Sequence, residues 1–412
     1  VPEDAKEFIA MMNGERKLYR GQPINTNFCM SNPKARKRVA DYVANYAQGH
    51  SNIDYLHVWL ADANNNHCEC SECVKKLPSD FYVALLSEID ETLTDENIKT
   101  RIVFIAYMDT AWAPLFEKIK NPDRFVLLLA AITRDYTETP DMSASGGELP
   151  KFVLNKNVFP SDLGDYIRYS EGWQETAFTP KFCYEYHFWI HQYYDFGGIR
   201  LAERLYEDVR AYRDAGFFGI IQDGSQRSFF PNGFPFYVYS RAMYDKEVSF
   251  EELREDYFSH AYGENWREIS DYLEKISDIF DVKYLEVPHR STAARNLISP
   301  KRAEALKEIA PLCAEMAKKL RAWRKVPQKR IFSLSMRILE LHAEYCVGLA
   351  ESMILTAEGK ADEAFDAFNS HFDSFGAHEF EIERYFDHHL AYSALKRSLH
   401  PGKNRIITEE IG

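Results

Sequence analysis

Residues 56–73 of the chain read LHVWLADANNNHCECSEC and join a strand pattern to a loop rich in reactive side chains. The apolar run Leu56–Ala61 is typical of a parallel strand that is covered on both faces. A helix pattern opens at Ser79, so the residues between them form a strand-to-helix loop. In α/β proteins such loops lie at the carboxyl ends of the strands, where ligands bind. The stretch therefore predicts an α/β fold with a functional site close to Asp62.

Strand and helix patterns alternate on both sides of this stretch. Six short apolar runs are predicted as strands: Ile24–Met30, Tyr55–Ala61, Arg101–Tyr107, Phe125–Ile132, Lys181–His187 and Phe217–Gln222. Six β-α units in tandem are typical of a (β/α) barrel or of a doubly wound sheet. A closed barrel needs eight strands. We therefore predict a (β/α)8-type barrel, with its first two strands expected ahead of Val1.

The second part of the chain has a helical pattern. From Phe250 onward, apolar residues recur three and four positions apart, as in Ile309, Cys313, Met316 and Leu320. We predict a barrel domain over residues 1–285 and a helical bundle over residues 286–412.

Composition narrows the function classes. The formal charge of -13 argues against a nucleic-acid partner, because phosphates are bound by stripes of Lys and Arg. No apolar run approaches the roughly 20 residues of a membrane span. Aromatic residues make up 14% of the chain and serve either as core or as platforms for sugar rings, whose C–H faces match an aromatic face.

Three cysteines, Cys68, Cys70 and Cys73, fall within six residues of the loop. Zn²⁺ prefers four ligands in a tetrahedron, and Cys29 is the favoured fourth because it ends the preceding predicted strand. His67 is an alternative ligand. A structural zinc site is the leading interpretation, while a disulfide with one thiol left over and free thiols remain open. Such a site would stiffen the loop, because four thiolates leave no position for water.

Two carboxylates are the candidate catalytic residues. Glu185 lies in the aromatic stretch 182–189, where burial would raise its pKa and suit a general acid. The alternative is a buried Glu paired with an Arg. Asp62 follows its own strand, where it can also be a turn residue, a helix cap or a Ca²⁺ ligand.

Other polar and aromatic residues at predicted strand ends are candidates for binding substrate: Tyr107, His187, Trp189, Asp223 and Asn65. Each of them is also common in purely structural roles, and Asp223-Gly224 in particular is ordinary turn chemistry. No Gly-rich phosphate loop follows a strand, so we expect no organic cofactor.

The order of several motifs resembles glycoside hydrolase family 163 over roughly residues 3–275. The motifs that carry the resemblance are Phe28–Pro33, Cys68–Cys73, Ala106-Tyr107, Tyr184–Tyr186, Asp214–Gly219 and Ala261–Gly263. The resemblance implies a barrel enzyme that is periplasmic, at the cell surface or secreted. It also implies endo-β-N-acetylglucosaminidase activity on the N-glycans of glycoproteins, with the acetamido group of the substrate as nucleophile. Glu185 would then be the acid/base, and Asp62 or Tyr107 would orient the acetamido group.

Two other functions fit the same residues. The chain can be a non-catalytic glycan-binding protein that uses the aromatic residues alone. It can also be a metal-dependent hydrolase that uses Cys68, Cys70 and His67 and keeps one coordination position open for water.

Overall fold

The computed structural model of the chain describes residues 3–140, 148–177, 179–224, 227–286 and 295–401, which form two compact units. The first unit comprises Val1–Asp135, Pro140–Glu185 and Ala211–Ile221, and the second comprises Tyr136–Thr139, Tyr186–Arg210 and Gln222–Gly412. The boundary expected at residue 286 adjoins residues 287–294, which lie outside the described residues. That boundary stays a prediction.

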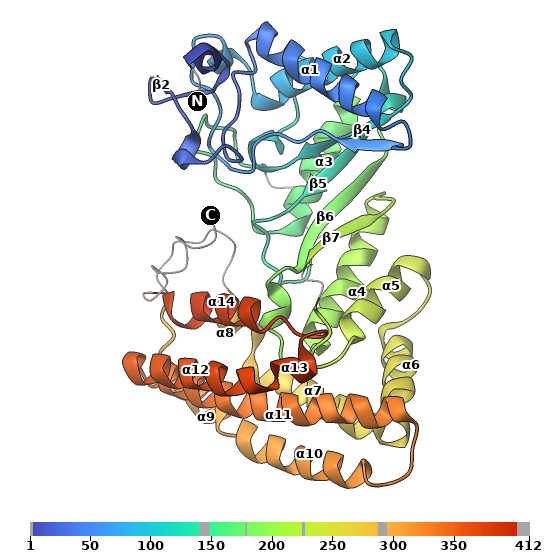
Figure 1. The fold of residues 1–412 in the computed structure, drawn as a ribbon, viewed down its shortest axis with the longest axis vertical. Helices are drawn as coiled ribbons and strands as arrows, with labels where there is room; N and C mark the ends of the chain where they lie inside the picture. Colours follow the sequence, from blue (N-terminus) through green and yellow to red (C-terminus); the bar gives the residue numbers. More distant parts are fainter. Residues whose placement is uncertain (1–2, 141–147, 178, 225–226, 287–294, 402–412) are drawn as a thin grey trace. The chain divides into compact units, whose positions relative to one another are not determined.

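A parallel sheet of five strands, in the order β3-β4-β5-β6-β7, is the framework of the first unit (Figure 1). The strands are β3 (Tyr55–His57), β4 (Arg101–Ala106), β5 (Phe125–Ala130), β6 (Lys181–Phe188) and β7 (Ile220–Gly224). The register places Leu56 opposite Ile102 and Ile105 opposite Leu128. The carboxyl ends of these strands therefore lie at one edge of the sheet.

The expected (β/α)8 barrel is wrong for the part of the chain that the structure describes. Five parallel strands form an open half-barrel there, and the remaining two strands, β1 (Met11–Met12) and β2 (Glu15–Arg16), form a separate antiparallel pair. The predicted strand Ile24–Met30 is not part of the sheet. Phe28 makes only an isolated antiparallel bridge to Ile9, and the carbonyl of Ile24 accepts a bond from the Asp62 N–H.

Four helices accompany the strands along the chain: α1 (Pro33–Gly49), α2 (Pro78–Asp95), α3 (Leu163–Ala177) and α4 (Ile199–Asp214). The Asn32 side chain caps α1 by accepting bonds from the backbone N–H groups of Lys34 and Ala35. Helix α4 ends before Gly216, whose φ of +77° suits glycine. Helices α1 and α2 pack side by side, as Figure 1 shows.

Side chains alternate between the two faces of the sheet. Phe104, Leu129 and Cys183 pack into one core with Trp173 of α3. We call this side the helix-covered face. The residues between them point the other way and form a smaller cluster, listed as Val103, Ile105, Val126, Leu128, Ala130 and Phe182, with Tyr107 and Tyr184 packed against it. We call this side, together with His57 and Trp59, the aromatic face.

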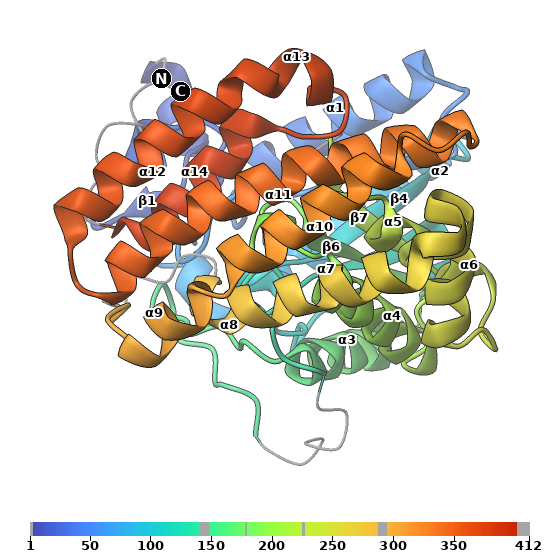
Figure 2. The same cartoon turned by 90° about the horizontal axis from the view of Figure 1, so that it is seen from below.

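The second unit is mainly helical beyond β7, as its sequence pattern predicts. Its helices are α5 (Phe234–Tyr244), α6 (Phe250–Tyr262), α7 (Trp266–Phe280), α8 (Val282–Leu285), α9 (Pro300–Leu306), α10 (Ile309–Trp323), α11 (Arg330–Ala357), α12 (Ala361–Phe375), α13 (Glu379–Ile382) and α14 (His388–Leu399). Helices α10, α11 and α12 lie side by side (Figure 2). The predicted stripe of α10 is buried, including Cys313 and Leu320. Among the described residues, no helix combines the length and the apolar character that crossing a membrane requires.

Candidate functional site

The four predicted cysteines meet in the first unit. The Sγ atoms of Cys29, Cys68, Cys70 and Cys73 all lie within 4.8 Å of one another. The Sγ of Cys29 lies 3.7 Å from that of Cys70 and 3.9 Å from that of Cys73. A disulfide would need about 2.05 Å, and all four thiols are free. The predicted cysteine set is therefore confirmed as a cluster, and the disulfide alternative does not fit it.

The cluster has the dimensions of a metal site. Four sulfurs at about 2.3 Å from a central ion are separated from each other by about 3.8 Å, which matches the spacing around Cys29. The Met11 N–H donates a bond of 3.2 Å to the Cys68 Sγ, a contact typical of the surroundings of metal thiolates. Hydrogen bonds among the sulfurs hold the pKa of the Cys29 thiol below its usual range and raise the pKa of the Cys68 and Cys73 thiols. These four residues can therefore hold a metal ion.

His67 is not among the ligands. Its Nε2 lies 3.2 Å from the carbonyl oxygen of Cys73, and its ring packs against Phe81. Burial lowers the pKa of His67 to about 4, so the imidazole is neutral. Because four thiolates complete a tetrahedron, this centre offers no open position of the kind that a metal-dependent hydrolase needs.

The asparagines after Asp62 fix the loop. The Asn65 N–H donates to Asp109 Oδ2 at 2.6 Å, and Asn65 Oδ1 accepts a bond of 2.7 Å from the Asn157 N–H. Asn157 also bonds to Asp109 through its side chain. Asn65, predicted as a substrate-binding residue, has its side chain committed to this network. Neither Asp109 nor Asn157 was predicted, because their partners lie 44 to 92 positions away in the sequence.

Asp62 and Tyr107 come together at the carboxyl edge of the sheet. Asp62 follows β3 and Tyr107 follows β4, and the Tyr107 hydroxyl donates a bond of 2.9 Å to Asp62 Oδ1. Asp62 is exposed and Tyr107 is half-buried. The pair therefore presents one carboxylate and one hydroxyl to solvent, close to the aromatic face on which Tyr107 packs.

The aromatic face carries large aromatic side chains that are exposed to solvent. Trp59 is 44% exposed, and its ring meets Tyr184 edge-on at 5.7 Å between centroids. His57 meets Phe182 in the same way at 6.2 Å. Burial against these neighbours lowers the pKa of His57. An exposed Trp ring on the face of the sheet that also carries Tyr107 is suited to stacking on a polar ring-shaped ligand.

Glu185 lies on the opposite face. Its neighbour Tyr184 points to the aromatic face, so alternation directs Glu185 to the helix-covered face, where its side chain is 0% exposed. Its carboxylate pairs with Arg134 at 2.8 Å and accepts a hydrogen bond from the Tyr212 hydroxyl. Burial and the nearby Glu185 raise the pKa of Tyr212 well above its ordinary value. This geometry is that of the alternative stated above, a buried Glu paired with an Arg, and it does not bring Glu185 and Asp62 together.

Three further predicted residues belong to the second unit. His187 is buried, with Nε2 at 2.8 Å from Asp208 Oδ2 and Nδ1 facing Gln222. Trp189 is half-buried and packs its ring against Tyr186. Asp223 is half-buried on β7. His187 thus has the surroundings of a structural histidine.

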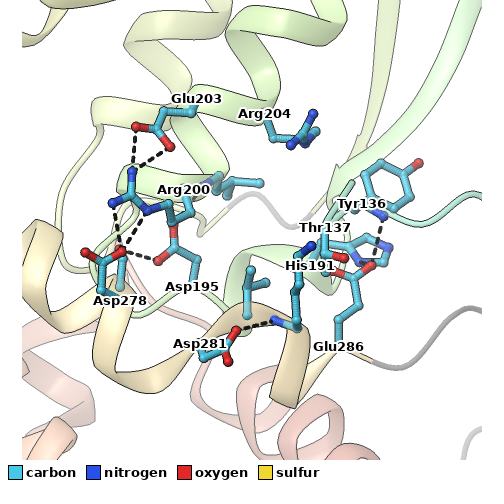
Figure 3. Close-up of a pocket in the computed structure, with 14 residues that line it drawn as sticks. Tyr136, Thr137, His191, Asp195, Arg200, Glu203, Arg204, Asp278, Asp281 and Glu286 are labelled. Carbon is cyan, nitrogen blue, oxygen red and sulfur yellow. Dashed lines mark hydrogen bonds and ion pairs between the residues drawn. The ribbon is translucent and has the colours of Figure 1, made fainter. Parts of the chain in front are cut away.

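The second unit also contains a cavity of about 220 Å³ that is lined by several charged residues (Figure 3). Its charged walls pair with one another: Arg200 bonds to Glu203 at 2.6 Å and to Asp278 at 2.7 Å. His191 Nδ1 lies 2.9 Å from Glu286 Oε1. The residues that line the cavity include none of the predicted site residues.

Comparison with known families identifies the family to which the chain belongs. The model of a family described as a domain of unknown function, DUF4838, matches residues 2–274, about two thirds of the chain. The chain belongs to this family. The match covers the cysteine cluster, the Asp62–Tyr107 pair and every strand of the sheet. A search of curated proteins gives no match.

Proposed function

We propose that this chain is a glycoside hydrolase that binds a glycan against Trp59 and works on it with Asp62 and Tyr107. The observation that carries the proposal is the 2.9 Å bond between Asp62 and Tyr107, at the end of the face on which Trp59 is exposed and meets Tyr184. A carboxylate near the reacting sugar stabilises the positive charge that develops at the anomeric carbon. The carboxyl edge of a parallel sheet is also the usual place for such chemistry.

The resemblance to glycoside hydrolase family 163 favours cleavage of N-glycans by an endo-β-N-acetylglucosaminidase. In a substrate-assisted reaction, the acetamido oxygen attacks the anomeric carbon while the glycosidic bond breaks and the leaving oxygen takes up a proton, so the protein has to orient the acetamido group. The Asp62 carboxylate can accept a hydrogen bond from the acetamido N–H, while the Tyr107 hydroxyl donates to the acetamido oxygen. In the absence of substrate the Tyr107 hydroxyl donates to Asp62, so binding of the acetamido group would replace this bond with one from Tyr107 to the acetamido oxygen and one from the acetamido N–H to Asp62.

The cysteine cluster is proposed as a structural zinc site. The donor set of four thiolates and the sulfur spacing of 3.7 Å and 3.9 Å both suit Zn²⁺. The ion would join Cys29, ahead of α1, to the loop that begins at Asp62. Its contribution would be to the order of that loop, since a closed tetrahedron does not activate water.

A non-catalytic glycan-binding protein is the second candidate. The observation in its favour is that Glu185, the acid expected from the sequence, is sealed in an ion pair on the other face of the sheet. In this case the aromatic face would bind glycan and no bond would be cleaved.

The experiment compares the wild-type chain with Asp62→Asn and Tyr107→Phe on N-glycosylated proteins, using mass spectrometry to detect released glycans. The two variants are nearly isosteric, so glycan binding measured by calorimetry serves as the control for folding. Release that falls at least 100-fold in Asp62→Asn, with binding kept, supports the hydrolase. Binding without release in all three proteins supports the binding protein, and neither binding nor release rejects both.

A further inference from the structure

We infer that Asn27 and Asn66 are positioning residues that couple the cysteine cluster to Asp62, an inference that rests on the proposed function of Asp62. Both side chains are buried, at 9% and 2% exposure. Asn27 Nδ2 donates a bond of 2.9 Å to Asn66 Oδ1. Each residue stands two positions ahead of a cysteine of the cluster, Asn27 before Cys29 and Asn66 before Cys68.

The Asn27 side chain reaches the backbone at Asp62. Its Oδ1 accepts a bond of 3.2 Å from the Ala61 N–H, the residue directly before Asp62. The Asp62 N–H itself donates to the Ile24 carbonyl at 2.9 Å. A third bond to residues 24–27 comes from Asn66, whose Nδ2 donates to the Asn25 carbonyl at 2.8 Å.

These bonds form a closed frame. Residues 24–27 hold Ala61, Asp62 and Asn66 through these hydrogen bonds, and each of the two segments leads to a cysteine of the same cluster. When an ion binds the cluster, it fixes the separation of Cys29 and Cys68 and therefore of the two asparagines. The Asn27–Asn66 bond transmits this constraint to the backbone of Asp62, whose carboxylate must meet Tyr107.

Hydrogen exchange at Ala61 and Asp62, read by mass spectrometry on the full chain, tests the coupling independently of turnover. Asn27→Ala removes the acceptor of the Ala61 N–H and the donor to Asn66. Because a lost hydrogen bond is worth about tenfold in a local opening equilibrium, we expect exchange at Ala61 to rise about tenfold. Zinc content, measured by metal analysis, should stay at the wild-type level since the thiols are unchanged.

A matched control is Asn155→Ala, because Asn155 bonds to His67 and Glu69 of the same loop but not to the Asp62 segment. This variant should leave exchange at Ala61 and Asp62 unchanged. Asn66→Ala keeps the acceptor for Ala61, so it serves as a second, milder break if Asn27→Ala does not fold. Its expected effect is faster exchange at Asp62 with a smaller change at Ala61.

Removing the metal from wild type with a chelator should raise exchange in the same segment. The coupling is overturned if Asn27→Ala and Asn66→Ala both exchange as wild type does, or if chelation changes exchange only at the cysteines. A wild-type chain that cleaves no glycan would reject the proposed function alone, because the exchange pattern decides the coupling by itself. In an active chain, the coupling predicts that Asn27→Ala lowers kcat more than it raises KM.

Discussion

Replacing Arg134 by Met is expected to destabilise the first unit strongly, because the substitution leaves the buried Glu185 carboxylate without its cationic partner. The two side chains are 1% and 0% exposed, and their charged atoms lie 2.8 Å apart. Removing one member of a buried pair costs about 3–5 kcal/mol. Against the 5–15 kcal/mol that typically holds a domain folded, that cost is about a fifth of the stability or more. The Tyr212 hydroxyl offsets only part of it, because a single neutral donor cannot replace a guanidinium.

The double variant Arg134→Met with Glu185→Leu removes both charges at once. Its cost is expected to be well below the cost of Arg134→Met, since apolar residues of similar volume often replace a buried ion pair with little loss. Unfolding in urea, followed by circular dichroism, measures both variants against wild type. Glu185→Gln is measured in the same way, with glycan binding and glycan release recorded beside its stability.

Two results would refute a structural role for this pair. One is an Arg134→Met variant that unfolds at the urea concentration of wild type. The other is a Glu185→Gln variant of wild-type stability that still binds glycan but no longer releases it. The second result would make Glu185 the acid/base after all, and would require the sheet to open at Arg134 during the reaction.

Cys29→Ser is expected to lose most of its bound zinc and to unfold at a lower temperature, because one of the four ligands is removed; metal analysis and thermal melting check this. Stability of the second unit is expected to fall as the pH drops from about 6.5 to about 4. Burial lowers the pKa of His342 and of His371 to about 4, so the unfolded chain binds protons first. Each of these two histidines is expected to lower the free energy of unfolding by about 3 kcal/mol over this pH range. Urea unfolding at several pH values measures the change. Trp59→Ala is expected to weaken glycan binding about tenfold in calorimetry, since a stacking surface worth about 1.4 kcal/mol is lost.

Matched controls exist for each of these changes. Cys183→Ser alters a buried thiol outside the cluster and should leave zinc content unchanged. His260 is exposed, so His260→Gln should leave the pH profile of stability as it is, whereas His342→Gln should flatten it. Trp59→Phe keeps an aromatic ring and should bind glycan more tightly than Trp59→Ala. A zinc content in Cys29→Ser equal to that of wild type would contradict the metal site. A pH profile of stability in His342→Gln equal to that of wild type would contradict the role of this histidine, and wild-type glycan affinity in Trp59→Ala would contradict stacking on this ring.

The cysteine centre could be predicted from sequence because its ligands lie close together in the chain. Cys68, Cys70 and Cys73 occupy a single loop, and only Cys29 had to be brought from elsewhere. Five of the six predicted strands are present for a similar reason, since a short apolar run is a local signal. The sixth, Ile24–Met30, contains Asn25, Thr26 and Asn27, and its backbone is used by the loop at Asp62 instead of by the sheet.

The closed barrel could not be derived from local patterns. Strand number and closure depend on which backbone edges meet, and a count of β-α units does not determine this. Arg134, Asp109 and Asn157 were missed for a related reason. Each acts through a partner at least 44 positions away, so no spacing in the sequence connects them.

The placement of Glu185 was within reach of the sequence. On β6 the aromatic residues Phe182 and Tyr184 and the pair Cys183 and Glu185 alternate with period two, so one set had to face the helices. A free Cys is a small buried hydrophobe, which already favours the helix-covered face for Cys183 and hence for Glu185. We therefore expect reactive carboxylates of this sheet after the ends of the strands, as with Asp62, because a residue inside β6 on the side of Glu185 is buried and held by partners such as Arg134.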